Sequence, residues 1–172
     1  MKFIGALFLF FISSICFSQQ ITVNEEETKV TFVFLDQDVT GELSDFNFTG
    51  AIDLTSLETA TIAGTVATET LDTNNWLRSR HLRGKKYFYA KAFPKLEFKS
   101  NRIEAMGDTF RVSGSLTMKG ITKDVVWIFS IKGNTLEGTA RVNTQDHDII
   151  IYDDRDRNEV AITISMPFTK SN

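Results

Sequence analysis

The sequence TFRVSGSLTMK, residues 109–119, alternates apolar and polar side chains along its length. Phe110, Val112, Leu116 and Met118 belong to the apolar set, and arginine, serine, threonine and lysine residues stand between them. Successive side chains of a β-strand point to opposite faces of the sheet, so this period of two is typical of a strand with one dry face and one wet face. The stretch therefore predicts an antiparallel strand that lines a core.

The same period of two recurs in four other parts of the chain. These runs lie at residues 31–34, 95–99, 136–143 and 160–168. Turn signals that contain glycine separate the runs, and Gly133 with Asn134 predicts a tight hairpin. Together the runs predict about eight antiparallel strands, arranged either as a barrel or as a two-sheet sandwich. Periodicity alone does not distinguish these two arrangements.

Residues 72–93 interrupt the alternation. Trp76 and Arg80 are spaced to share one face of a helix, and Asp72 or Thr73 is a suitable N-cap. Gly84 is a suitable end. The sequence thus predicts one short helix at about residues 73–84.

The first 18 residues follow the order of a secretory signal peptide: a positive start at Lys2, an apolar run at residues 3–12, and small residues up to Ser18. The apolar run has about half of the roughly 20 residues that a helix needs to cross a bilayer, so we expect no permanent membrane anchor. A lipid-modified Cys16 is the weaker alternative, because the large Ile15 precedes it. We expect cleavage of residues 1–18, a single domain at residues 19–172, and a periplasmic or secreted location.

Composition and motifs argue against several functional classes. With 19 basic and 22 acidic residues, the chain has a net charge of −3, which disfavours a nucleic-acid-binding surface over the whole domain. The sequence contains no G-x-S-x-G motif and no glycine-rich phosphate loop, and with the expected cleavage its single cysteine leaves with the signal peptide. The acidic segment at residues 143–159 is interleaved with arginines, which favours a salt-bridged loop over a metal site. We expect no enzymatic activity, no cofactor and no metal ion.

The basic segment at residues 78–100 is open to two interpretations. It is either a charged outer helix face with its apolar side packed on the sheet, or the rim of a cavity mouth. In the second case Arg78, His81 and Arg83 would bind an anionic headgroup, because the planar guanidinium group matches phosphate and carboxylate oxygens.

This segment also carries a resemblance. The patterns R-x-x-H-L-R-x-x-x-[FY]-F at residues 78–88 and F-P-x-L-x-F-x-S at residues 93–100, followed by GSLTMKGITKDV at residues 114–125, resemble the YceI-like family of polyisoprenoid-binding proteins. The resemblance implies an exported, lipocalin-like, eight-stranded antiparallel barrel whose apolar cavity holds a polyisoprenoid or similar amphiphile. The chain departs from the family pattern near its start, where Asn24, Glu27 and Thr28 stand at positions that are usually Asp, His and Ser.

We therefore predict an all-β fold, an eight-stranded antiparallel lipocalin-like β-barrel with the short helix near its mouth. The expected ligand is a polyisoprenoid or fatty-acid-like lipid, bound for transport or storage, and a homodimer is possible. The predicted cavity wall consists of dry-face residues of the strands. They are Phe32, Phe34, Phe98, Val112, Leu116, Trp127, Phe129, Val142, Ile162 and Ile164.

Two other functions remain open. The first is a structural or stress-related exported barrel whose core is filled by its own side chains. The second is an enzyme for a lipid or quinone-like substrate, which would need His81 to point into the cavity beside a carboxylate.

Overall fold

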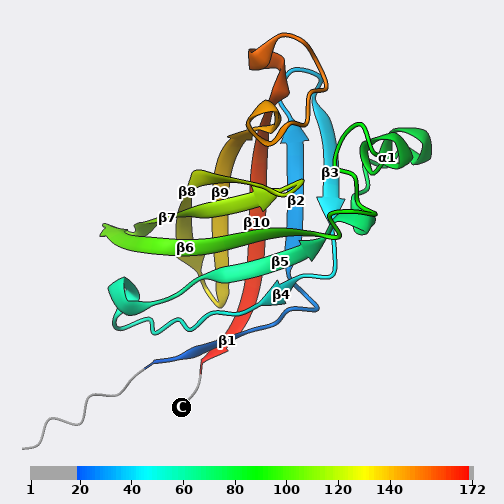
Figure 1. Ribbon diagram of the computed structural model, residues 1–172. Helices are drawn as coiled ribbons and strands as arrows, with labels where there is room; N and C mark the ends of the chain where they lie inside the picture. Colours follow the sequence, from blue (N-terminus) through cyan, green and yellow to red (C-terminus); the bar gives the residue numbers. More distant parts are fainter. Residues whose placement is uncertain (1–18, 171–172) are drawn as a thin grey trace, which may run out of the picture.

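The structure is a computed structural model that describes residues 19–170, in which ten strands form one antiparallel sheet (Figure 1). The predicted signal peptide, residues 1–18, lies outside the described residues. The strands are β1 (Ile21–Val23), β2 (Lys29–Phe34), β3 (Val39–Leu43), β4 (Asn47–Phe48), β5 (Ala63–Ala67), β6 (Lys95–Met106), β7 (Thr109–Met118), β8 (Ile121–Lys132), β9 (Thr135–Asn143) and β10 (Glu159–Lys170). The helices are α1 (Trp76–Leu82) and four short 3-10 turns, η1 (Leu57–Thr59), η2 (Thr68–Thr70), η3 (Thr144–His147) and η4 (Arg155–Asn158).

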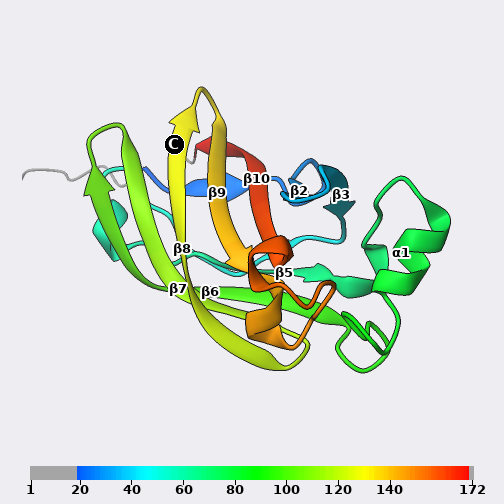
Figure 2. The ribbon, with the colours of Figure 1, turned by 90° about the horizontal axis from the view of Figure 1, so that it is seen from above.

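The sheet curls around one apolar interior (Figures 1 and 2). Its strand order is β3-β2-β10-β9-β8-β7-β6-β5-β4, with β1 paired to the end of β10. The two edge strands are β3 and β4, which follow each other in the chain, so the curl of the sheet brings its two edges together. We call the junction between these two edges the seam. Backbone bonds between Glu42 and Asp72 and from Ala67 N to Ser44 O hold part of this seam.

The all-β, antiparallel, barrel-like fold with one helix is confirmed, but the number of strands is ten and not eight. The extra strands include two very short ones. β1 has three residues and β4 has two, and such lengths are too short for a period of two to be recognised. The alternation at residues 109–119 is confirmed, since all four of its apolar side chains are buried.

Helix α1 begins later than the sequence predicted. Its N-cap is Asn75, whose side chain accepts a hydrogen bond from the backbone N–H of Arg78, and not Asp72 or Thr73. Asn74 has a left-handed backbone (φ 55°), so the helical conformation cannot extend back from α1 to Thr73. The prediction of the cap was therefore wrong, because a residue with positive φ cannot continue a helix.

The β9–β10 connection is the salt-bridged loop that its sequence indicated. Asp146 pairs with Arg155 at 2.9 Å, and Arg157 pairs with Asp36 of the β2–β3 turn, also at 2.9 Å. The fully buried Asn158 side chain bonds the backbone of this loop from within. Within residues 19–170, no cluster of three or more His, Cys, Asp or Glu side chains is arranged to hold a metal ion.

Candidate functional site

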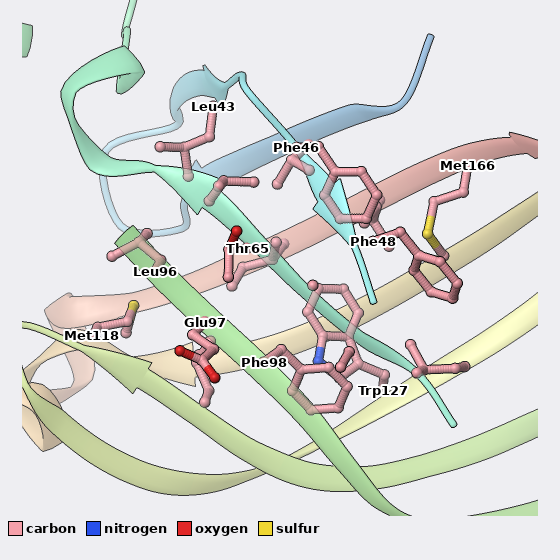
Figure 3. Close-up of a pocket in the computed structure, with 18 of the residues that line it drawn as sticks. Leu43, Phe46, Phe48, Thr65, Leu96, Glu97, Phe98, Met118, Trp127 and Met166 are labelled. Carbon is pink, nitrogen blue, oxygen red and sulfur yellow. The ribbon is translucent and has the colours of Figure 1, made fainter. Parts of the chain in front are cut away.

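An apolar cavity of about 100 Å3 lies inside the curled sheet (Figure 3). Strands from both sides of the seam contribute its wall, because residues of β2 and β3 on one side and of β4, β5 and β6 on the other line it together with β7, β8 and β10. The predicted residues in this wall are Phe98, Leu116, Trp127, Phe129, Ile162 and Ile164. The lining is almost entirely hydrocarbon, so the site favours an apolar ligand over a polar one.

A second cavity of about 40 Å3 lies nearer to α1 and is also apolar. Three more predicted residues line it: Phe32, Phe34 and Val142. Four residues line both cavities, so the two adjoin and form one elongated interior. They are Leu43, Leu96, Met118 and Ile162.

One predicted wall residue, Val112, lines neither cavity, although it is completely buried in the core. Conversely, several lining residues were not predicted. Met118 and Leu96 belong to alternating runs, so the period of two could have identified them. Phe46 and Phe48 flank Asn47 in a run too short to show periodicity, and their position follows from the closure of the sheet.

Phe46 and Phe48 cover the cavity at the seam (Figure 3). The Phe46 ring lies over Gly64, where a Cβ atom would come within 2.9 Å of the ring. β4 pairs with β5 on one side, and on the other side the Phe48 N–H donates to Glu25 Oε1 at 2.7 Å. A single side chain thus takes the place of a neighbouring strand on this side of β4.

Trp127 carries a buried polar group beside the cavity. The side chain is 6% exposed, and its Nε1–H has no hydrogen-bond partner among the described residues. The indole packs against the rings of Phe98 and Phe129, with centroid distances of 5.9 and 5.8 Å. An unpaired buried donor is costly, so an acceptor on a ligand would be stabilised here.

The predicted headgroup residues do not line either interior cavity. Arg78 donates from Nε to Thr73 Oγ1 and from Nη2 to Thr73 O, both at 2.9 Å. Arg83 donates from Nη1 to Glu69 O at 2.7 Å. Both guanidinium groups therefore fasten α1 to the preceding segment, whereas His81 is exposed on the outer face of the helix.

A polar network beneath α1 completes this attachment. The buried Ser79 hydroxyl donates to Asp72 Oδ1 at 2.9 Å and accepts from the Thr73 N–H at 2.9 Å. The Ser79 hydrogen bond is the main reason that the pKa of Asp72 lies below its usual value. The sequence did not identify Ser79, because its role depends on the fold of residues 72–75.

The second histidine lies away from the cavities. His147 is buried, and its Nδ1 donates to Ile121 O at 2.9 Å. Burial lowers the pKa of its imidazole, since the charged form loses its hydration. His147 therefore contributes to the attachment of the β9–β10 loop to β8.

Comparison with known proteins points to one family. The model of the YceI-like domain matches residues 21–168. A UPF0312 protein of Photorhabdus laumondii is 33% identical over 86 residues, and one of Yersinia pestis is 33% identical over 85 residues. These matches span about half of this chain and 45% and 44% of the two relatives.

Solved structures share the fold. Burkholderia cenocepacia BcnA has a TM-score of 0.76 at 21% identity, over 88% of this chain and 100% of that chain. A polyisoprenoid-binding domain from Saccharophagus degradans has a TM-score of 0.60 at 11% identity, over 88% of this chain and 98% of that chain. Across residues 19–170, no helix has the length and hydropathy needed to cross a membrane.

Proposed function

Because the chain belongs to the YceI-like domain family, we propose that it binds a polyisoprenoid or similar long-chain amphiphile in its apolar interior. The observation that carries the proposal is the elongated pair of adjoining cavities, with side chains from five long strands around an almost entirely hydrocarbon lining. The polyisoprenoid-binding domain with the same fold supports it further.

Energetics favour recognition through the ligand's tail. Burial of each methylene-sized group contributes about 0.8 kcal/mol before the costs of association are subtracted. A chain of several isoprene units can therefore bind without ion pairs to its headgroup. This agrees with the interior positions of the wall residues and with the use of Arg78 and Arg83 in bonds to the protein's own backbone.

The interior must widen to accept such a chain. Cavities of about 100 and 40 Å3 are smaller than the roughly 300–1,000 Å3 of typical ligand sites. Met118 and Met166 line the larger cavity and have flexible side chains that can change rotamer. The segment with Phe46 and Phe48 can move outward, because the bond to Glu25 is its link on the side away from β5. We assign the ligand-bound state to a protein with this segment displaced.

The proposed role is transport or storage of the lipid by an exported protein. The order of charged, apolar and small residues in the first 18 positions supports export to the periplasm or beyond. Binding is favoured over catalysis because His81 is exposed and lines neither interior cavity, contrary to what an enzyme built around it would need.

The test is native mass spectrometry of the purified protein together with extraction and identification of its lipids. We expect a co-purified long-chain lipid, or uptake of an added polyprenol with one-to-one stoichiometry. If the protein stays ligand-free and ignores both polyprenols and fluorescent hydrophobic probes, its core is a filled one and the structural alternative holds.

A further inference from the structure

We propose that the outer face of α1 and the basic segment that follows it form a docking surface for anionic phospholipid bilayers. The surface is built around four exposed residues of α1: Trp76, Leu77, Arg80 and His81. α1 stands out from the side of the barrel near one of its ends (Figures 1 and 2). The proposal goes beyond ligand binding, because this surface lies outside the cavities.

The geometry of α1 separates an attached face from a free one. Ser79 and Leu82 are buried against the protein, and Arg78 and Arg83, on either side of them, bond to residues 69–73. The opposite face carries Trp76, with 69% of its surface exposed, and Leu77, with 58% exposed. Two large apolar side chains that are so exposed on one short helix are unusual for a solvated surface.

Charge distinguishes this surface from the rest of the molecule. Residues 73–96 contain seven Lys and Arg residues and no Asp or Glu, which leaves 12 of the 19 basic residues with all 22 acidic ones elsewhere. Arg80, Lys85 and Lys86 are exposed, and no ion pair among the described residues includes them. The segment is therefore cationic on an otherwise acidic protein.

These cations surround an open depression. It has a volume of about 620 Å3 and is lined by Leu77, His81 and Tyr87 together with Arg80, Lys85 and Lys86. Such a mixture of amphipathic aromatic, aliphatic and cationic side chains matches the headgroup region of an anionic bilayer, where Trp and Leu enter the interface and Lys and Arg contact phosphate. Arg80 already lies over the Trp76 ring at 5.4 Å, so its charge and the indole would reach the same depth.

The docking surface is connected to the proposed lipid site. A second depression, of about 520 Å3, lies beside α1 and is lined by Leu77, Leu82 and Phe34 among others. Phe34 also lines the smaller interior cavity. A bilayer in contact with α1 would therefore lie beside the part of the interior that Phe34 lines.

The test is flotation of the purified, ligand-free protein with vesicles of phosphatidylcholine alone or with about a third phosphatidylglycerol. We expect binding to the anionic vesicles that weakens as salt is raised. In a Trp127→Phe background, Trp76 is the remaining tryptophan, and its emission should shift to the blue on binding.

Two sets of substitutions address the two components of the surface. Each cation contributes about fivefold near an anionic bilayer, so Arg80→Glu with Lys85→Glu and Lys86→Glu should weaken binding more than about 100-fold. Trp76→Ser with Leu77→Ser should abolish the salt-resistant part of binding.

The matched controls lie on the outer face of the sheet. Lys29→Glu, Arg111→Glu and Arg141→Glu change charge equally, and Val126→Ser with Ile128→Ser removes exposed apolar groups from β8. Both controls should keep vesicle binding within a few-fold of the unsubstituted protein.

The proposal would be overturned if the control variants lost as much vesicle binding as the variants of the docking surface. It would also be overturned if the protein bound neutral vesicles as well as anionic ones. Binding of duplex DNA through the same three cations without binding of vesicles would overturn it as well. Because the protein and vesicles carry no polyprenol, failure here leaves the proposed lipid binding in the interior intact.

Discussion

The backbone N–H of Phe48 donates a hydrogen bond to the side chain of Glu25, with 2.7 Å between the nitrogen and Oε1. This bond joins β4 to the turn between β1 and β2, across the seam of the sheet. Because Phe48 and Phe46 line the larger cavity, the Glu25 carboxylate restrains the part of the wall that we propose to move when a ligand enters.

Glu25→Gln should accelerate exchange of a bound chain. The neutral amide keeps the shape of the side chain but replaces a charge-assisted hydrogen bond with a weaker one, so the segment opens more often. Stopped-flow displacement of a fluorescent lipid probe should give release rates several-fold above those of the unsubstituted protein. The neighbouring Glu26→Gln is the control, and equal release rates in the two variants would exclude this restraint.

Trp127→Phe should lower the affinity for ligands that carry a hydrogen-bond acceptor more than the affinity for pure hydrocarbon chains. The indole N–H has no acceptor in the wall, so a ligand with a carbonyl or hydroxyl at that depth gains a hydrogen bond of about 0.5–1.5 kcal/mol, or roughly two- to twelvefold in affinity. The measurement is competition by two chains of equal length, one with a carbonyl and one without. Loss of affinity for both chains alike would show that Trp127 contributes only volume.

Ser79→Ala should loosen α1. The substitution leaves the buried Thr73 N–H without its partner, which costs about 1–3 kcal/mol of the free energy of unfolding. Hydrogen exchange should rise at residues 73–83 and stay unchanged in β7 and β8. Ser56→Ala serves as the control, because it removes a partly exposed hydroxyl that bonds to the Glu58 side chain. The same hydrogen exchange at residues 73–83 in both variants would contradict the role of Ser79.

The free energy of unfolding should fall as the pH drops below about 6.5, the ordinary pKa of histidine. The pKa of His147 is lowered by burial, so the unfolded chain binds a proton more readily than the folded one, and acid favours unfolding. The negative charge of Asp146 acts to raise the pKa of His147, and the positive charge of Lys123 acts to lower it further. In His147→Gln, the denaturation midpoint should change less between pH 7 and pH 5 than in the unsubstituted protein. In the exposed His81→Gln, the midpoint should change with pH as it does in the unsubstituted protein. The opposite pattern would refute the assignment.

The period of two predicted the longer alternating strands, and seven of the nine predicted residues that line a cavity lie in those runs, because each run fixes which side chains face inward. The other two, Trp127 and Phe129, belong to a stretch that is apolar on both faces. The period of two could not predict the seam. Phe46, Phe48 and Glu25 come together only when β3 and β4 become the two edges of a curled sheet. Contacts of this kind depend on closure of the whole sheet and leave no local pattern.

The basic segment illustrates the second limit of local patterns. Arg78, His81 and Arg83 appeared equivalent, yet the two arginines bond to backbone oxygens of residues 69–73 and the histidine faces outward. Asn74, with its positive φ, sets where α1 begins and hence which side chains point inward. Residue type alone predicted the segment's charge but not the direction of each side chain.

Lipid loading of two matched variants tests the central claim most directly. Ile162→Phe places a larger side chain where the two cavities adjoin, whereas Val126→Phe places the same ring on the exposed face of β8. Native mass spectrometry after incubation with a polyprenol should show a one-to-one complex for the unsubstituted protein and Val126→Phe, and at least tenfold less for Ile162→Phe. Equal loading of all three proteins, or no loading of any, would contradict binding in the interior.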